Sequence, residues 1–343
     1  MTGSLVRRRL LRATAAVVMA LGVATGGTAS ADERSYILAT ATTGGTYYPV
    51  GVALATLVKV KLQPKQKIAM SAISSAGSGE NVKLLREDQA QFAILQGLFG
   101  QWAWNGTGKV KADGPQAHLR SVSMLWQNVE HFAVLSKFAK SGTVDDLMGL
   151  KGEKFSIGKK NSGTEGSGLT ILSNLGIDAD AHFDIANMGY GPSADALQNG
   201  TVSGVNMPGG APVGAMTRAF AALDNDLTVL DFTDDQVKKA NGDGSLWTRF
   251  VIAADTYPGQ GKAINTIAQP NFLAVRADVD EDAVYQITKT MYENLPFLQN
   301  IHKATKAMAL EKALAGLPAP LHPGAAKYYK EAGLEVPDRL MAN

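Results

Sequence analysis

A short β-rich segment, a glycine-rich loop and a helical segment follow one another three times in this sequence, and that order constrains the fold more than any other feature. The paired β-rich and helical segments are Tyr36–Ala41 with Val50–Val60, Ile68–Ser74 with Glu80–Glu87, and Phe155–Gly158 with Leu169–Leu175. Alternating strands and helices indicate parallel pairing, because each helix carries the chain back to the start of the next strand. The sequence therefore predicts an α/β fold.

The length of 343 residues indicates two lobes, because one domain typically holds roughly 100–200 residues. We expect residues 32–130 to form the first part of lobe 1 and residues 131–272 to form lobe 2. Residues 273–343 then return to lobe 1 and end in C-terminal helices. The predicted crossings lie near Asn128–Ser136 and Asn271–Asp278. No internal repeat with a fixed period is present, which argues against a solenoid or a propeller.

The N-terminal 31 residues are typical of a signal peptide. Arg7, Arg8, Arg9 and Arg12 precede an apolar stretch around Ala15–Val23, and Ala29-Ser30-Ala31 provides small residues before a cleavage site at Ala31-Asp32. The apolar stretch is too short to span a bilayer, which needs about 20 residues. Both the general secretory route and the twin-arginine route stay open for this segment. We expect the mature chain, with 29 basic and 31 acidic residues, to be periplasmic.

The composition argues against most catalytic chemistry. The chain has no cysteine, and its five histidines are isolated in sequence, so no zinc or iron–sulfur motif is present. The nucleophile elbow, the dinucleotide fingerprint and the P-loop are also absent from the sequence. Basic residues after Asp32 are dispersed, which argues against nucleic-acid binding. We therefore expect a binding protein without a metal, a cofactor or catalytic residues, and we separately expect it to be a monomer.

The three glycine-rich loops are the best candidates for a binding site. They are Thr43–Tyr47, Ser75–Gly79 and Asn161–Thr164. Each leads into a predicted helix, whose first N–H groups have no intrahelical partner and whose dipole is positive at that end. For a single loop, a plain turn with glycine at positive φ is the simpler interpretation. Three such loops divided between two lobes favour a clamp that holds a small carboxylate.

Five ordered motifs carry a family resemblance. They are TGGTYYPVG (Thr43–Gly51), SAGSGENVKLL (Ser75–Leu85), KGEKFSIGKKNSGTE (Lys151–Glu165), YPGQ (Tyr257–Gln260) and PLHPGAAKYYKEAG (Pro320–Gly333). Together they resemble the TAXI family, the extracytoplasmic solute-binding subunits of TRAP transporters. The resemblance implies a class II periplasmic-binding-protein fold, with a hinge and a cleft between two lobes. It also implies capture of a small organic acid, such as glutamate, a related dicarboxylate or a 2-oxo acid, and delivery to a TRAP membrane permease.

The same resemblance implies the ligand-binding residues. They are Thr43, Gly44, Gly45, Thr46, Tyr47, Ser78, Gly79, Gln96, Ser162, Gly163, Thr164, Gly209, Gly210, Ala211 and Pro212. The sequence departs from the family pattern at Gly97-Leu98-Phe99, where an aspartate is common, and at Lys160-Asn161, where Pro-Gly is usual. Lys159 or Lys160 could supply a cation for a second carboxylate, or could be solvated surface.

Two other functions stay open at this stage. One is a secreted enzyme of this fold that uses a carboxylate or lysine base on a small carboxylate. The other is a sensor subunit that signals through a partner. Turnover of a bound acid would favour the enzyme, and uptake that persists after deletion of the protein would favour the sensor.

Overall fold

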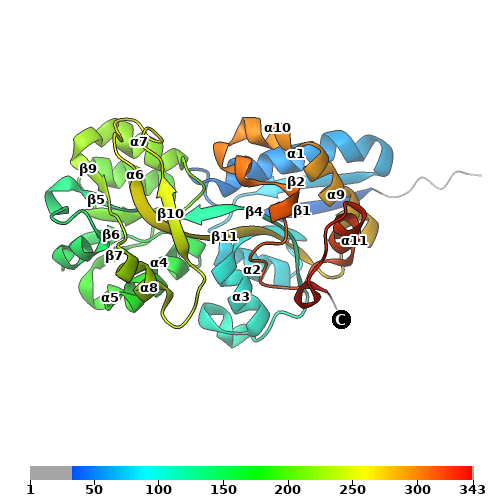
Figure 1. The fold of residues 1–343 in the computed structure, drawn as a ribbon, viewed down its shortest axis with the longest axis horizontal. Helices are drawn as coiled ribbons and strands as arrows, with labels where there is room; N and C mark the ends of the chain where they lie inside the picture. The colour runs from blue at the N-terminus through cyan, green and yellow to red at the C-terminus, as the bar shows by residue number, and fades with distance from the viewer. Residues whose placement is uncertain (1–32, 342–343) are drawn as a thin grey trace, which may run out of the picture. The chain divides into compact units, whose positions relative to one another are not determined.

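The computed structural model describes residues 33–341 (Figure 1). The predicted signal peptide, residues 1–31, lies outside the described residues. None of the described helices combines the length and the apolar character that a membrane span requires. The described chain forms two sheets with helices packed around them, and Figure 1 shows two halves connected by long strands.

The first sheet has six strands, most of them in lobe 1, and its edge strand extends into lobe 2. Its strands are β1 (Arg34–Ala39), β2 (Ile68–Ile73), β3 (Phe92–Gln96), β4 (Leu119–Val129), β10 (Thr248–Ile252) and β11 (Ile264–Arg276). The order is β10-β11-β3-β1-β2, and β4 also pairs with β11. Strand β1 is parallel to β2 and β3, as the alternating pattern predicts, whereas β11 is antiparallel to β3, β4 and β10.

The antiparallel pairs of β11 add to the parallel pairing that the alternating pattern predicts. Strand β4 carries the chain out of lobe 1 and β11 carries it back, so the two strands run in opposite directions and pair antiparallel. The apolar sequence NFLAVR predicts a strand over Asn271–Arg276, but this is only the second half of β11, which begins at Ile264. Pro270 explains the short prediction, because proline lacks an N–H group and argues against a central strand. In the structure, β11 pairs with β3 only from Asn271 onward.

The second sheet has five short strands and belongs to lobe 2. They are β5 (Phe132–Leu135), β6 (Lys154–Ser156), β7 (Asp184–Ala186), β8 (Gly204–Asn206) and β9 (Leu227–Val229), in the order β7-β6-β8-β5-β9. The chain enters this sheet directly after β4, through Glu130 and His131. The two-lobed α/β fold expected from the sequence is therefore confirmed. The exact lobe boundaries stay predictions, because β11 contributes side chains to the cores of both lobes.

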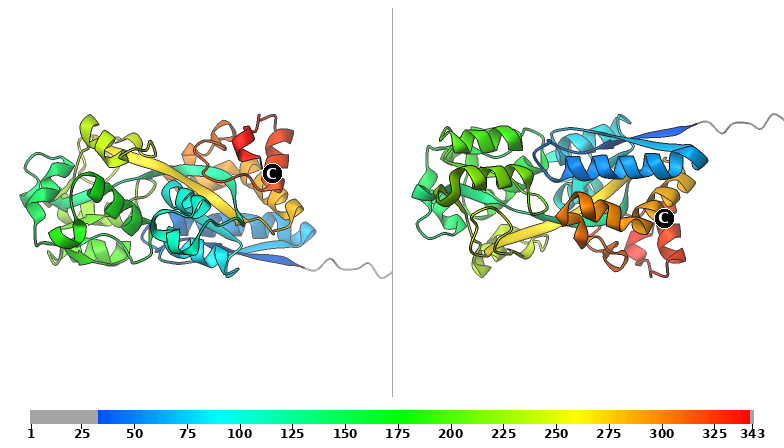
Figure 2. Two further views of the ribbon diagram at one scale, coloured as in Figure 1. Left: turned by 90° about the horizontal axis from the view of Figure 1, so that it is seen from below. Right: turned by 90° about the horizontal axis from the view of Figure 1, so that it is seen from above.

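The helices pack on the faces of their own sheets (Figure 2). Those of lobe 1 are α1 (Tyr47–Gln66), α2 (Ser78–Arg86), α3 (Gly97–Asn105), α9 (Glu281–Glu293), α10 (Leu295–Ile301) and α11 (Pro323–Glu331). Those of lobe 2 are α4 (Gly163–Asn174), α5 (Ala179–His182), α6 (Tyr190–Gln198), α7 (Gly214–Leu223) and α8 (Asp234–Asn241). Short 3₁₀ helices are η1 (Gly108–Asp113), η2 (Ser136–Phe138), η3 (Val144–Leu150), η4 (Asp224–Asp226), η5 (Lys303–Ala307), η6 (Leu310–Lys312) and η7 (Asp338–Leu340).

Local sequence accounts for the limits of helix α1. Pro49 lies in its first turn, where the missing N–H group has no intrahelical acceptor to lose. Lys67 ends the helix in the left-handed conformation, and its N–H donates to the carbonyl of Gln63. Between these ends Leu54, Leu57 and Val58 are buried in the core of lobe 1. The N-terminus of α1 is thereby fixed at the end of the first glycine-rich loop.

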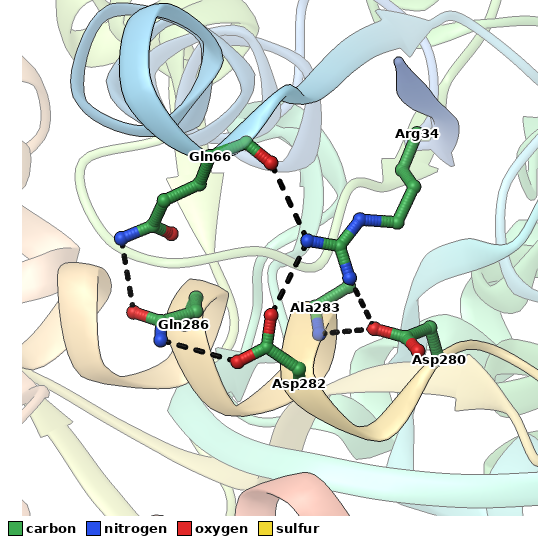
Figure 3. Close-up of polar contacts among 6 residues, drawn as sticks. All are labelled: Arg34, Gln66, Asp280, Asp282, Ala283 and Gln286. Atoms are coloured by element: carbon green, nitrogen blue, oxygen red, sulfur yellow. Dashed lines mark hydrogen bonds and ion pairs between the residues drawn. The ribbon is translucent and has the colours of Figure 1, made fainter. Parts of the chain in front are cut away.

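An ionic cluster ties three distant segments together on the surface of lobe 1 (Figure 3). Arg34 of β1 forms ion pairs with Asp280 and, at 3.2 Å, with Asp282. It also donates to the carbonyl of Gln66 at the end of α1. Asp280 accepts the N–H of Ala283 at 2.8 Å and so caps helix α9. The cluster joins the first strand, the first helix and α9 through side chains that are 32–57% exposed.

Candidate functional site

A small cavity lies between the two lobes, and it is the strongest candidate for a functional site. Its walls come from residues of both lobes, and its volume is about 30 Å³, which leaves room for about one or two water molecules. The lobes therefore contact one another around this cavity.

The N-termini of three helices meet at the cavity, and they are the three that the glycine-rich loops predict. Thr46, Gly77 and Ser162 are the N-cap residues of α1, α2 and α4, and all three line the cavity. Two further helices, α3 and α6, begin directly after the cavity residues Gln96 and Gly189. Lobe 1 supplies α1, α2 and α3, and lobe 2 supplies α4 and α6.

Several main-chain donors at these helix ends are unpaired. Within residues 33–341, the N–H groups of Tyr47, Ser78, Gly163 and Thr164 donate to no other group. Such first-turn N–H groups normally find a cap, water or a ligand. Because these donors belong to both lobes and lie at the positive ends of helix dipoles, the arrangement suits an anion.

Glycine at position 163 lets the two lobes approach closely. A Cβ atom at Gly163 would lie 2.7 Å from Cδ of Gln96 and 2.9 Å from Oγ of Ser78, both in lobe 1. Beside this contact, the N–H of Glu80 in α2 donates to the carbonyl of Asn161 in lobe 2 at 2.9 Å. A Cβ atom at Gly79 would lie 2.4 Å from the same carbonyl. Both glycines are required by the close backbone packing between lobes.

Polar side chains hold the loops of the cavity in place. Ser162 caps α4 by accepting the N–H of Glu165 at 3.0 Å. The hydroxyl of Thr46 donates to the carbonyl of Gly210 at 3.0 Å, which links α1 of lobe 1 to the Gly209–Pro212 turn. The hydroxyl of Tyr190 donates to the carbonyl of Pro208 and contacts the hydroxyl of Thr164 at 2.7 Å. These bonds fix where the main-chain donors point.

Most of the predicted site residues line the cavity. They are Gly45, Thr46, Tyr47, Ser78, Gln96, Ser162, Gly163, Thr164 and Gly209. The predicted residues outside the lining are Thr43, Gly44, Gly79, Gly210, Ala211 and Pro212.

Three of the residues outside the lining pack closely against neighbouring groups. Thr43 is exposed, and the carbonyl of Gly44 accepts the N–H of Ala215 at 3.0 Å. Gly79 packs over Asn161, and a Cβ atom at Gly210 would lie 2.4 Å from that of Ala304. Gly44, Gly79 and Gly210 therefore support the loops rather than face the cavity.

The other half of the lining residues is absent from the predicted set. They are Ala41, Thr42, Ala76, Gly77, Asn128, Lys159, Gly189, Tyr190 and Pro208. Ala76 and Gly77 belong to a loop that the sequence singles out, Thr42 directly precedes another, and the sequence leaves Lys159 with two possible roles. Gly189 and Tyr190 begin a strand–glycine–helix unit that could have been found by the same pattern. Asn128 lies within a strand and carried no local signal.

The cavity lining is nearly free of ionised side chains. Lys159 is its one charged residue, and Lys159 forms no ion pair within residues 33–341. No aspartate, glutamate or histidine is among the lining residues. Burial raises the pKa of Tyr47 and of Tyr190, so both phenols keep their protons at neutral pH. The lining therefore presents neutral donors and one cation to an entering molecule.

Two buried ionisable residues stand behind the cavity, where the chain crosses into lobe 2. Burial raises the pKa of Glu130 to about 7, and Asn206 donates to its carboxyl group at 2.9 Å. Burial lowers the pKa of His131 to about 4. Its Nδ1 bonds to the carbonyl of Val129, and its Nε2 bonds to the hydroxyl of Tyr257 at 2.7 Å. Both residues therefore favour their neutral forms.

No set of three or more histidine, aspartate or glutamate side chains comes together as a metal site within residues 33–341. The structure thus offers the described part of the chain no cluster that would hold a metal ion. The expectation that the protein needs no metal or cofactor stays a prediction.

Comparisons with known proteins agree with this architecture. The profile of the NMT1-like family matches residues 38–333. The chain is similar to the structure of MatC from Rhodopseudomonas palustris with bound malate, at 14% identity and a TM-score of 0.54, over 87% of this chain and 98% of MatC. It is also similar to the periplasmic binding protein BugD, at 13% identity and a TM-score of 0.52, over 88% of this chain and 95% of BugD. The fold is that of the periplasmic binding proteins.

Proposed function

This chain belongs to the NMT1-like family, and from that premise and the geometry of its cleft we propose that it is a solute-binding protein. It captures a small organic anion between its lobes and releases it to a membrane permease. The sequence motifs that resemble the TAXI family support a permease of the TRAP type. The predicted signal peptide supports a location outside the cytoplasmic membrane.

The convergence of helix N-termini from both lobes is the observation that carries this proposal. Ser78 of lobe 1 and Gly163 and Thr164 of lobe 2 have unpaired N–H groups at one cavity. A carboxylate placed there accepts hydrogen bonds from both lobes and interacts with the positive ends of α2 and α4. Because neither lobe supplies all of these donors, the anion is bound most tightly when the lobes are closed.

Closure follows from the same contacts. The cavity of about 30 Å³ is smaller than a glutamate-sized acid, so the lobes separate to admit one and close around it. Strands β4 and β11 and the Glu130-His131 segment connect the lobes and supply the hinge. An anion that contacts both lobes shifts the equilibrium toward the closed form by its differential affinity.

The ligand class is a small carboxylate, with glutamate, a related dicarboxylate or a 2-oxo acid as the first candidates. Neutral main-chain donors hold one carboxylate, and Lys159 is the cation available to a second negative group. The malate bound to MatC is a dicarboxylate, which agrees with this class. The absence of a carboxyl or imidazole group among the lining residues supports binding without turnover.

Mass spectrometry of the small molecules released from denatured protein tests the proposal. The chain from Asp32 to Asn343 is purified without added solutes, denatured and extracted, and each candidate acid is then titrated into refolded protein. We expect one small organic acid to be recovered unchanged and to bind with a stoichiometry of one. Conversion of that acid by the protein, or no binding of any small anion, would contradict the proposal.

A transport experiment tests the partner. Deletion of the protein is expected to abolish uptake of the same acid by cells that carry a TRAP permease. Addition of the purified protein is expected to restore uptake into membrane vesicles that contain the permease. Uptake that continues without the protein would leave a sensor function as the better explanation.

A further inference from the structure

Three amide side chains lie where the strands of lobe 1 reach the cavity. Asn271 of β11 is in register with Gln96 of β3, and Asn128 lies toward the end of the neighbouring strand β4. Gln96 is 3% exposed, Asn128 is 2% exposed and Asn271 is fully buried. Gln96 and Asn128 line the cavity, whereas Asn271 lies behind them.

A chain of hydrogen bonds fixes the orientation of two of these amides. The hydroxyl of Tyr47 donates to Oδ1 of Asn271 at 2.5 Å. Nδ2 of Asn271 then donates to Oδ1 of Asn128 at 3.5 Å. Because burial raises the pKa of Tyr47, its phenol keeps its proton and remains the donor at the start of this chain. Asn271 must therefore present its carbonyl oxygen to Tyr47 and its NH₂ group to Asn128.

The orientation leaves the NH₂ group of Asn128 free. Within residues 33–341, Nδ2 of Asn128 is buried and has no hydrogen-bond partner. A buried donor without an acceptor is unfavourable, and such a group in a native structure requires an explanation. The residue lines the cavity that receives the unpaired N–H groups of both lobes, so an acceptor in that cavity would satisfy it.

We infer that Asn128 is a ligand-binding residue that donates a hydrogen bond to an oxygen of the bound anion, and that Tyr47 and Asn271 are positioning residues that keep its NH₂ group turned toward the cavity. The inference rests on the proposed function. It adds a neutral side-chain donor to the main-chain donors of the helix N-termini. It also explains why an asparagine is fully enclosed at the end of a strand that crosses between lobes.

The test measures anion affinity in Asn128→Leu, which keeps the branched shape of the side chain but removes the donor. The probes are L-malate, L-glutamate and 2-oxoglutarate, each titrated separately into the chain from Asp32 to Asn343. For a probe that binds the wild-type chain, Asn128→Leu is expected to raise the Kd by tenfold to a hundredfold, the range for a hydrogen bond to a charged group. Circular dichroism and thermal unfolding check that the variant is folded.

A double-mutant cycle with Tyr47→Phe separates positioning from structural support. Tyr47→Phe removes one hydroxyl, and it is expected to raise the Kd by about threefold to tenfold because the Asn271 amide is no longer held in one orientation. In the Asn128→Leu background the same substitution is expected to change the Kd by less than twofold. Tyr329→Phe is the matched control, since Tyr329 is fully buried in lobe 1 and its hydroxyl donates to the carbonyl of Val122, away from the cavity. It should leave the Kd unchanged.

The outcomes separate the inference from the proposed function. If the wild-type chain binds a probe and folded Asn128→Leu binds it equally well, the inference is wrong and the proposed function stands. Should Asn128→Leu fail to fold, Tyr47→Phe decides by itself, and an unchanged Kd in that variant overturns the inference. If the wild-type chain binds none of the three probes, the proposed ligand class is wrong and the inference falls with it.

Discussion

The cavity between the lobes and the Arg34 cluster both join segments that are far apart in the sequence. The cavity does so mainly with neutral groups, whereas the Arg34 cluster does so with charged groups. The cleft joins the lobes through glycine packing, hydroxyls and main-chain groups, with Lys159 as the only charge in its lining. The Arg34 cluster joins β1, α1 and α9 through a guanidinium and two carboxylates that are 32–57% exposed. Burial therefore decides which groups are used, since an ion is expensive to bury and inexpensive to leave in water.

This difference predicts where substitutions matter most. In the buried region, ionisation of one side chain or addition of one methyl group has a large effect on stability or affinity, because the close packing cannot readily adjust. On the exposed surface, water screens the charges and replaces lost hydrogen bonds, so the effect is small. Four predictions test this contrast, in decreasing order of expected size.

Glu130 and His131 should give opposite pH dependences of the free energy of unfolding. The pKa of Glu130 rises from 4.5 to about 7 on folding, so its contribution falls by about 3 kcal/mol as pH increases between those values. The pKa of His131 falls from 6.5 to about 4, so its contribution falls by about 3 kcal/mol as pH decreases between those values. In the wild-type chain the two slopes oppose each other between pH 4.5 and 6.5.

Glu130→Gln removes one of these slopes. We expect its free energy of unfolding, measured by urea denaturation from pH 4 to pH 8, to rise with pH up to about 6.5. Above pH 7 the variant should be more stable than the wild-type chain, because glutamine does not ionise in the buried site. Parallel pH profiles for the two proteins would show that Glu130 does not titrate as its burial implies.

Gly163→Ala should hinder closure of the cleft. The added methyl group would lie 2.7 Å from Cδ of Gln96, which is itself buried, and overpacking of this kind costs about 1–3 kcal/mol. We expect the Kd for the acid recovered from the wild-type chain to rise by about tenfold or more, with a larger radius of gyration in solution. Gly149→Ala is the matched control in lobe 2, because a methyl group there meets open space. Equal affinities in the two variants would refute the close-packing argument.

Lys109→Ala should weaken the contact between the lobes only slightly. Lys109 of η1 pairs with Glu165 of α4 at 3.0 Å, and the lysine side chain is 37% exposed. Loss of this ion pair is expected to reduce anion affinity by less than about 1 kcal/mol, and the difference should shrink at high salt. Lys111→Ala, in the same turn, provides the comparison, since Lys111 forms no ion pair within residues 33–341. A salt-independent loss of affinity would contradict the electrostatic explanation.

Arg34→Ala should have the smallest effect. Its ion pairs are exposed, so the free energy of unfolding should fall by about 0.5 kcal/mol. Asp280→Ala should cost about 1 kcal/mol, because Asp280 also caps α9 through the N–H of Ala283. Urea denaturation of both variants measures the difference. If Arg34→Ala were less stable than Asp280→Ala, the ion pairs would contribute more than the helix cap, which would contradict this prediction.

The sequence predicts those parts of the fold and of the cavity that local patterns determine. A strand, a glycine-rich loop and a helix form a local unit, so the positions of Thr46, Ser78 and Ser162 at helix N-termini follow from neighbouring residues. The resemblance to the TAXI family added Gln96 and Gly209 to the expected site, and both line the cavity.

Residues brought together only by long-range pairing could not be predicted in this way. Asn128 becomes a cavity residue because β4 pairs with β11, and no pattern around it shows that partner. The first half of β11 was missed because Pro270 interrupts an otherwise strand-like sequence. The antiparallel direction of β4 and β11 follows from the two crossings between lobes, which is a property of the whole chain.

A crystal structure of the chain with its bound acid tests the central claim most directly. The account predicts that carboxylate oxygens accept hydrogen bonds, at about 2.7–3.0 Å, from the N–H of Ser78 in lobe 1 and from that of Gly163 or Thr164 in lobe 2. An acid held by the Lys159 side chain alone, or by one lobe without main-chain donors of the other, would contradict it.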